Sequence, residues 1–305
     1  MKKILYTVIL SFFGVLLMAQ NEVQFTQHQL FSRLAYNPAF AGAMCAPVIN
    51  GVYRNQWMGL DKAPETGRIE FHAPFGNNRS GFGVGLTRDQ AGIFNNTYLD
   101  LNYAYRIPVG GGRLGLGIKG QLDNGRAEWQ NTNPLDAGDQ FLQAGERSET
   151  KFNVGLGVYY DKNNWYLGLS APQLIKSSFF DQVGISGDEG DFRTYYLMGG
   201  LVTDLSSNVK LVPQFLLSVN PSAPIDLDLM GNLVFMEKLW LGLNYRLGDS
   251  FGGMLQYQLT DNFRAGLSYD FTTTMLNMVS NGTLEFNANY IFGSCNEEIS
   301  NLRFF

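Results

Sequence analysis

Apolar and polar residues alternate along most of the chain from residue 47 onward. In the stretch 94–107, for example, Leu101 and Tyr103 share one phase, and Asp100 and Asn102 share the other. A period of two places successive side chains on opposite faces of an extended strand. Each stretch has roughly 8 to 14 residues, which suits a tilted strand that crosses a bilayer. About fourteen stretches are bounded by turn residues: 47–57, 67–76, 80–90, 94–107, 113–123, 150–161, 164–171, 192–204, 208–219, 225–236, 238–247, 250–259, 262–271 and 281–293.

Two features favour a membrane barrel over a soluble sandwich, in which strands also alternate. The polar phase mixes Gly, Asn, Asp and Arg, as a wet or plugged lumen does. Its charged members predict a polar, charge-paired interior: Arg106, Arg246, Arg264, Asp100, Asp270 and Glu285. Aromatic residues near the strand ends resemble membrane-interface girdles: Tyr53, Trp57, Trp165, Tyr166, Trp240, Tyr290 and Phe292. The strand at 208–219 is weaker, because Pro213 removes a ladder donor and suggests a bulge or break.

The connections that follow even-numbered stretches differ in length from those that follow odd-numbered ones. If the N-terminus is periplasmic, the periplasmic turns are all short: 77–79, 108–112, 162–163, 205–207, 237 and 260–261. Every long connection falls in the other set, which includes 124–149 and 172–191. Short periplasmic turns with longer outer loops are typical of outer-membrane barrels. A closed ladder also leaves no backbone amide unpaired in lipid. The sequence therefore predicts an all-β fold, a closed antiparallel transmembrane β-barrel of about 14 strands, with both termini periplasmic.

The two ends of the chain lie outside this pattern. Residues 1–19 have Lys2 and Lys3 before an apolar run, which predicts a cleaved secretory signal peptide. Residues 20–46 form an aromatic-rich periplasmic N-terminal segment that is a cap, a lumen plug or a linker. The barrel then occupies 47–293, and 294–305 forms a periplasmic tail. We expect an integral outer-membrane protein.

Composition narrows the function classes. The net charge of −5 and the pI near 5.1 make nucleic acid an improbable partner. Only 16% of the residues are charged, which agrees with a large lipid-facing surface. No run of about 18 apolar residues follows the first twenty positions, so no transmembrane helix is expected in the mature chain.

The candidate catalytic chemistry is sparse. His28 and His72 are the two histidines of the chain, and His72 lies two residues from Glu70 on the polar phase. Such a pair supplies half of a His-based catalytic site, but a lumen-facing polar pair is the simpler interpretation. No metal-ligand spacing and no phosphate-binding loop is present. We expect no enzymatic activity and no cofactor.

Cys45 and Cys295 lie just before the first predicted strand and just after the last one. Barrel closure makes these strands neighbours at the periplasmic end, and an exported protein is in a disulfide-permissive compartment. A Cys45–Cys295 disulfide is therefore a hypothesis.

Glycines recur on the polar phase and allow two interpretations. They either relieve twist and curvature in the wall or leave room for a plug or a bound segment. The positions are Gly83, Gly85, Gly115, Gly117, Gly155, Gly157, Gly242 and Gly266.

The stretch QFTQHQLFSRLAYNPAFAG (24–42) resembles the N-terminal motif of the PorP/SprF family, outer-membrane proteins of the bacterial type IX secretion system. The family pattern is Phe-Ser/Thr-Gln-Tyr/His, followed after several residues by Asn-Pro-Ala-Tyr/Phe-Ala-Gly. It is matched by Phe25, Thr26, Gln27, His28, Asn37, Pro38, Ala39, Phe40, Ala41 and Gly42. YYDKNNWYLGLSAPQL (159–174), the run 241–271 and the ending NLRFF resemble further family segments.

The resemblance implies a component that exports or anchors large surface proteins, such as gliding adhesins with a C-terminal secretion signal. The implied partners are such a secreted protein, other type IX secretion subunits and outer-membrane lipid. No catalytic residue set carries over. The lumen, the outer loops and the N-terminal segment are all candidate partner surfaces. A porin-like or hydrophobic-solute diffusion channel is the alternative, favoured by the polar, glycine-rich lumen.

Overall fold

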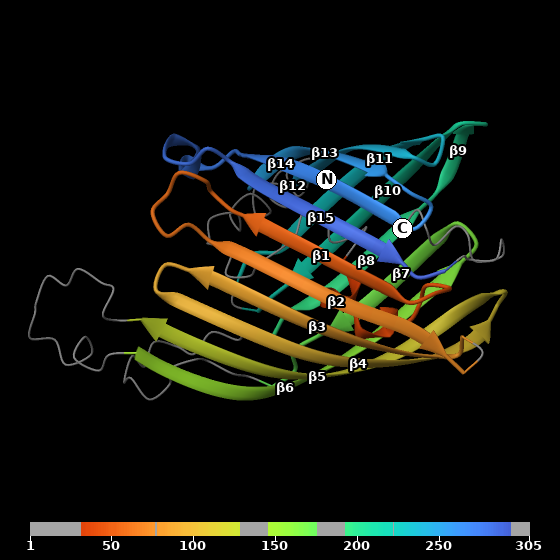
Figure 1. Ribbon diagram of the computed structural model, residues 1–305, viewed down its shortest axis with the longest axis horizontal. Coiled ribbons are helices and arrows are strands. Elements are labelled where there is room, and N and C mark those ends of the chain that lie inside the picture. The colour runs from red at the N-terminus through yellow and green to blue at the C-terminus, as the bar shows by residue number, and fades with distance from the viewer. Residues whose placement is uncertain (1–31, 77, 129–145, 176–192, 222, 294–305) are drawn as a thin grey trace, which may run out of the picture.

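The computed structural model describes residues 32–76, 78–128, 146–175, 193–221 and 223–293. In this part of the chain one antiparallel sheet contains fifteen labelled strands. Their bounds are β1 Val48–Asn55, β2 Glu65–Phe75, β3 Ser80–Ala91, β4 Phe94–Val109, β5 Gly112–Glu128, β6 Glu146–Lys162, β7 Trp165–Ala171, β8 Tyr195–Leu201, β9 Thr203–Ser206, β10 Val209–Val219, β11 Asp226–Phe235, β12 Leu239–Arg246, β13 Ser250–Gln258, β14 Phe263–Thr272 and β15 Thr283–Ile291. Figure 1 shows the strands tilted across the barrel wall.

The sheet closes on itself. The first strand pairs with the last, so Val48 lies opposite Ile291 on β15 and opposite His72 on β2. The β10–β11 pairing completes the ring. Since β8 and β9 follow one another along β10, the described residues form a closed barrel of 14 strands. The predicted fold class is confirmed.

The expected irregularity near Pro213 appears in the neighbouring strand rather than in β10. β10 runs unbroken through Pro213 and pairs it with Gly231 of β11. On its other side the pairing stops between Gln214–Gly200 and Leu211–Thr203, where Val202 separates β8 from β9. A proline has no N–H to donate there. Val202 bonds instead with Asn164, whose carbonyl oxygen accepts from the Val202 N–H at 2.7 Å.

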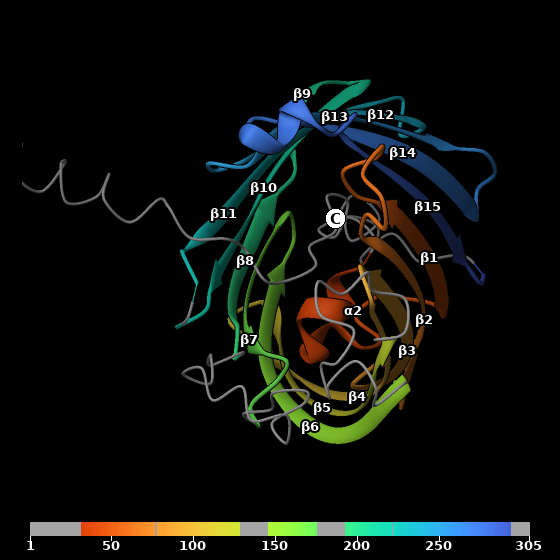
Figure 2. The same cartoon turned by 90° about the vertical axis from the view of Figure 1, so that its left-hand side faces the viewer.

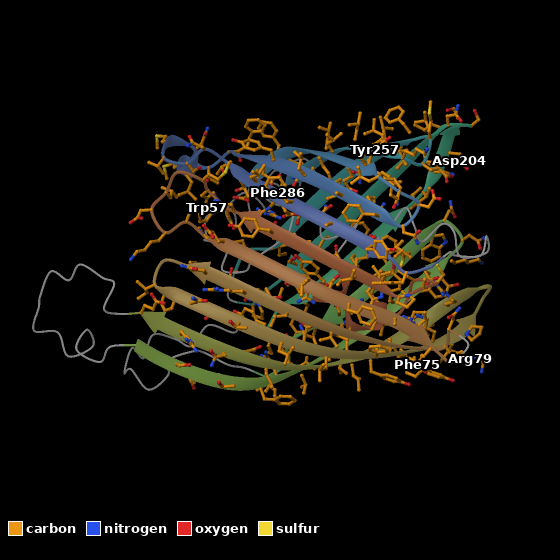
Figure 3. All side chains as sticks on the ribbon, in the orientation of Figure 1. Trp57, Phe75, Arg79, Asp204, Tyr257 and Phe286 are labelled. Atoms are coloured by element: carbon orange, nitrogen blue, oxygen red, sulfur yellow. The ribbon has the colours of Figure 1, made fainter. Side chains whose placement is uncertain are left out.

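The predicted phases divide lipid from lumen. Leu101 on β4 is 59% exposed on the outer surface, whereas the adjacent Asp100 is 1% exposed inside. Figure 3 shows the side chains that cover the outer wall. The girdle interpretation is wrong for Tyr166 and Trp240, which are each 2% exposed and face inward. Both occupy the inner phase of their strands, and this phase determines their direction whatever the residue type.

The loop asymmetry is also present. Short turns such as Gly110–Gly111, with φ of 58° and 78°, lie at one end of the barrel. Positive φ at both positions matches the strand twist in a tight hairpin, and glycine adopts it without strain. The connections 56–64 and 273–282, the latter with η5 Met275–Met278, lie at the other end. No helix among the described residues is long and apolar enough to cross a membrane.

Candidate functional site: the plugged lumen

Residues 32–46, here called the plug, lie inside the barrel before β1. They contain α2 Arg33–Tyr36 and the 3-10 turn η1 Pro38–Phe40. Figure 2 shows α2 within the ring of strands. Leu34, Ala39 and Ala41 are fully buried. Residues 32–46 are therefore packed in the lumen, and a linker interpretation does not fit them.

Asn37 connects the two short helical turns. Its backbone is extended, with φ −134° and ψ 110°, so it ends α2 and begins η1. The side-chain Oδ1 accepts from the Ala39 N–H at 2.9 Å, which satisfies a helix-start donor. Pro38 follows at the first helical position, where its missing N–H costs nothing. The same Asn37 donates through Nδ2 to the Val158 carbonyl oxygen of β6 at 3.0 Å.

Wall side chains bind the plug mainly through its backbone. Arg106 donates to the carbonyl oxygens of Ala39 and Ala41. Arg113 donates to the Ala43 carbonyl oxygen at 3.2 Å. These are charge-assisted bonds, which are stronger than neutral ones. The plug is therefore held by its main chain as well as by its side chains.

Two further wall residues complete this binding. Ser170 of β7 donates to the Tyr36 carbonyl oxygen at 2.8 Å. The Nδ1 atom of His72 accepts from the Gly42 N–H at 3.3 Å. Gly42 has φ +62°, and a Cβ there would collide with the Ala73 backbone, so the position requires glycine.

Inward glycines of the wall form the seat of the plug. A Cβ added at Gly117 would overlap the Ala39 backbone, and one at Gly157 would overlap the Asn37 side chain. Gly83 and Gly115 likewise face Leu34 and Ala39. The interpretation that these glycines make room for a plug is confirmed at these four positions. The others face different groups: Gly85 the Arg68 and Asp100 side chains, Gly155 the Pro172 backbone, Gly242 Asn232 and Gly266 Gln256.

Arg33 anchors α2 among aromatic rings. Its guanidinium lies 4.8 Å from the Phe40 ring centroid and 4.9 Å from that of Tyr166. Its NH1 donates to the Tyr159 hydroxyl at 3.2 Å. Cation–π contacts are strongest when desolvated, as here. The sequence alone does not single out Arg33, although it is the one cation within the aromatic run 31–40.

Charged residues elsewhere in the lumen pair across strands. Arg68 of β2 bonds Glu70 at 2.7 Å and Asp100 of β4 at 2.9 Å. Arg54 of β1 lies 3.2 Å from both Asp270 and Glu285. Arg246 of β12 bonds Asp228 of β11 at 2.8 Å. The predicted charge-paired interior is confirmed for Asp100, Asp270, Glu285 and Arg246.

Two of the charged residues that were predicted to face the lumen make contacts of another kind. Arg106 binds the plug, as described above. The guanidinium of Arg264 lies 4.6 Å from the Trp240 ring centroid. In the described part of the chain no group of three or more His, Cys, Asp or Glu residues could hold a metal ion.

Comparison with known protein families gives a match over residues 17–290, to the type IX secretion system membrane protein PorP/SprF. The chain belongs to this family. It is therefore an outer-membrane component of the type IX secretion system. A search of curated proteins finds no match.

Solved structures similar to this PorP/SprF barrel are other outer-membrane proteins. Omp33 of Acinetobacter baumannii has a TM-score of 0.50 at 11% identity, covering 82% of this chain and 100% of that chain. The CymD monoaromatic hydrocarbon channel has a TM-score of 0.49 at 9% identity, covering 88% and 94%. At such identities the likeness concerns the fold alone.

Two PorP/SprF motif segments meet in the lumen. The first, Asn37 to Gly42, forms the centre of the plug. The second, 159–174, supplies Tyr159, Tyr166 and Ser170, which all contact the plug directly or through Arg33. Phe25, Thr26, Gln27 and His28 lie outside the described residues. The motif residues from Asn37 onward thus encode a plug and its seat.

The lumen of this PorP/SprF barrel is also narrowed beyond the plug. Asn153 of β6 accepts at Oδ1 from the backbone N–H groups of Leu174 and Ile175, both at 3.0 Å. Its Nδ2 donates to the Ile175 carbonyl oxygen at 3.0 Å. These bonds draw residues 172–175 against the inner wall.

The remaining candidate residues are placed as follows. His72 binds the plug and Glu70 binds Arg68, so each side chain of this pair has its own structural partner. Cys45 packs against the buried core just before β1, whereas Cys295 lies outside the described residues. The pairing of Cys45 with Cys295 therefore stays a prediction, and so does the absence of enzymatic activity.

Proposed function

We propose that this barrel holds a large exported protein at the cell surface, or assists its export, by binding a segment that includes the C-terminal secretion signal. Family membership supports a role in secretion, and the plug supports binding over conduction. The proposal rests on one observation: wall side chains, including Arg106 and Arg113, donate hydrogen bonds to the plug backbone. The plug occupies the part of the lumen beside β3 to β6, where it takes the space that a solute path would need.

A co-purification experiment tests this proposal. The tagged barrel is isolated from outer membranes in mild detergent, and co-purifying proteins are identified by mass spectrometry. We expect a large surface protein and other secretion subunits, enriched at least tenfold over a tagged barrel of another family. Recovery of the same abundant membrane proteins from both barrels would contradict the proposal.

A porin-like or hydrophobic-solute diffusion channel is the second candidate, favoured by the polar side chains that line the lumen. Planar-bilayer recording separates the two functions. The purified barrel should show no steady conductance. Stable open-channel current from the unmodified protein would favour the channel and count against a binding role.

We also propose the chain topology that this function needs. Residues 1–19 are removed on export, and the short-turn end, the plug and the 294–305 tail face the periplasm. The Val48–Ile291 pairing brings the chain just before β1 close to the chain just after β15, which supports a Cys45–Cys295 bond. Mature-protein mass and protease shaving of intact cells test these assignments.

A further inference from the structure

One part of the inner wall carries polar side chains that the structure leaves unsatisfied. We call these four residues the amide wall; they come from β11, β12, β14 and β15: Asn232, Trp240, Ser268 and Asn287. Each is at most 5% exposed. Both amide atoms of Asn232 and Asn287, the Trp240 Nε1 and the Ser268 Oγ have no hydrogen-bond partner in the described part of the chain.

The strand register places these side chains on one continuous surface. Asn232 of β11 lies opposite Gly242 of β12. In the neighbouring row of cross-strand partners, Trp240 of β12 lies opposite Gln256 of β13. Further along that row, Asn287 of β15 lies opposite Gly266.

The plug contacts the wall from β1, where Asn50 donates to the Ser32 Oγ at 3.1 Å, to β8, where the Tyr196 ring lies 5.1 Å from that of Tyr36. The amide wall, on β11 to β15, belongs to the other part of the ring.

Buried polar groups without partners are costly, at about 1–3 kcal/mol each. Native proteins keep few of them, and each one calls for an explanation. Arg106, beside the plug, also has one unpartnered atom, Nη1, but this side chain bonds the plug through Nη2. Around the plug, Arg106, Ser170 and His72 all bond its backbone. The amide wall has side chains of the same hydrogen-bonding capacity without such a partner.

We propose that the amide wall binds an extended polypeptide segment of the exported partner. The Asn232 and Asn287 side chains each offer donors and an acceptor, which matches the N–H and C=O of a peptide group. The segment thus takes a place in the lumen comparable to that of the plug. This inference rests on the proposed function and assigns its binding site.

Two observations favour a peptide over an oligosaccharide. Sugar sites use open aromatic faces for stacking, but the Trp240 ring is already covered by Arg264 at 4.6 Å. The plug shows that this lumen already holds polypeptide by its backbone.

Site-specific photo-crosslinking in living cells tests the site. A photoreactive amino acid replaces Asn232 or Asn287, and the matched controls replace their lipid-facing neighbours Leu233 and Phe286. Adducts to a second protein should form from the two inner positions and be at least tenfold weaker from the outer ones. Heat-modifiable gel migration verifies that each variant is a folded barrel.

The outcomes distinguish the site from the function. If inner positions cross-link only within the chain, to a glycan or to nothing, while co-purification still recovers a partner, the site is wrong and the function stands. If co-purification also fails, the proposed function fails with it.

A pair of substitutions gives a second readout. Asn232→Leu with Asn287→Leu removes four unpartnered polar atoms at nearly constant volume. We expect partner recovery to fall at least tenfold, while the empty barrel unfolds at an equal or higher temperature. The proposal would be overturned if partner recovery stayed unchanged. It would also be overturned if recovery fell only together with the unfolding temperature of the barrel.

Discussion

Asn37 of the plug donates a hydrogen bond to the Val158 carbonyl oxygen of β6 at 3.0 Å, across 121 positions of sequence. The same side chain accepts from the Ala39 N–H at 2.9 Å. One amide thus orders the plug internally and attaches it to the wall. This double role explains why Asn, followed by Pro38, stands at this position.

Replacing Asn37 with Ala should loosen the plug without opening the barrel. The loss of these bonds leaves the buried Ala39 N–H without its acceptor, which costs about 1–3 kcal/mol. Hydrogen–deuterium exchange followed by mass spectrometry should show faster exchange over residues 32–46 and unchanged exchange in β12 and β13. The matched control is Asn208→Ala in an exposed short turn, which should leave the plug unchanged.

Gly117→Val should unseat the plug more completely, because its side chain would occupy the place of the Ala39 backbone. The control Gly231→Val adds the same side chain on the lipid face, where a Cβ meets nothing within 4 Å. Limited proteolysis from the periplasmic side should cleave residues 32–46 in the first variant only. Equal protection of the plug in both variants would contradict the glycine-seat assignment.

Breaking the Arg68–Asp100 pair should destabilise the barrel. Arg68→Met leaves two buried carboxylates without their cation, and such losses cost about 3–5 kcal/mol. The comparison is Lys210→Met, which breaks an exposed pair with Asp204 worth about 0–1 kcal/mol. Urea unfolding in detergent micelles measures both, and a smaller effect for Arg68 than for Lys210 would refute the argument.

Lipid contact at Leu101 predicts a depth-dependent penalty. Leu101→Arg should destabilise the folded barrel in bilayers by about 2–4 kcal/mol, whereas an arginine near an interface costs about 0–1 kcal/mol. Leu205→Arg, near the short turn after β9, provides the interfacial comparison. Unfolding from liposomes gives both values, and equal penalties would argue against a membrane-spanning wall.

The predicted Cys45–Cys295 bond should stabilise the closing seam. Peptide mapping without reductant should yield one cross-linked pair, and Cys45→Ser should release a free thiol at Cys295. Since a closed loop of this length restricts the unfolded chain, its loss should cost about 2–5 kcal/mol. Two free thiols in the wild-type protein would remove the hypothesis.

The strand positions and the lipid face could be predicted because period two is a local property. Leu101 and Asp100 follow it without reference to distant residues. The prediction that Trp240 and Tyr166 lie in an outer aromatic girdle is wrong, because the alternation along the strand, and not the residue type, determines which face a side chain occupies. Each lies in the same phase as a neighbouring inward glycine, Gly242 or Gly168, and this phase was readable from the sequence.

The plug contacts could not be predicted in the same way. The Arg33–Tyr159 bond spans 126 positions, and no local pattern indicates which wall residue faces a given plug atom. Likewise, the sequence predicts that Asn232 faces inward but not that its amide lacks a partner. Such properties depend on how the walls approach one another after closure.

The seam between β1 and β15 joins the first strand of the ring to the last. The plug precedes β1, whereas Val158 and Ser170, which bind it, belong to strands in the middle of the chain. The covalent link between the plug and β1 therefore ties the seam that closes the ring to strands on the opposite side of the lumen. Any force that separates β1 from β15 acts on a segment that is itself attached to β6 and β7.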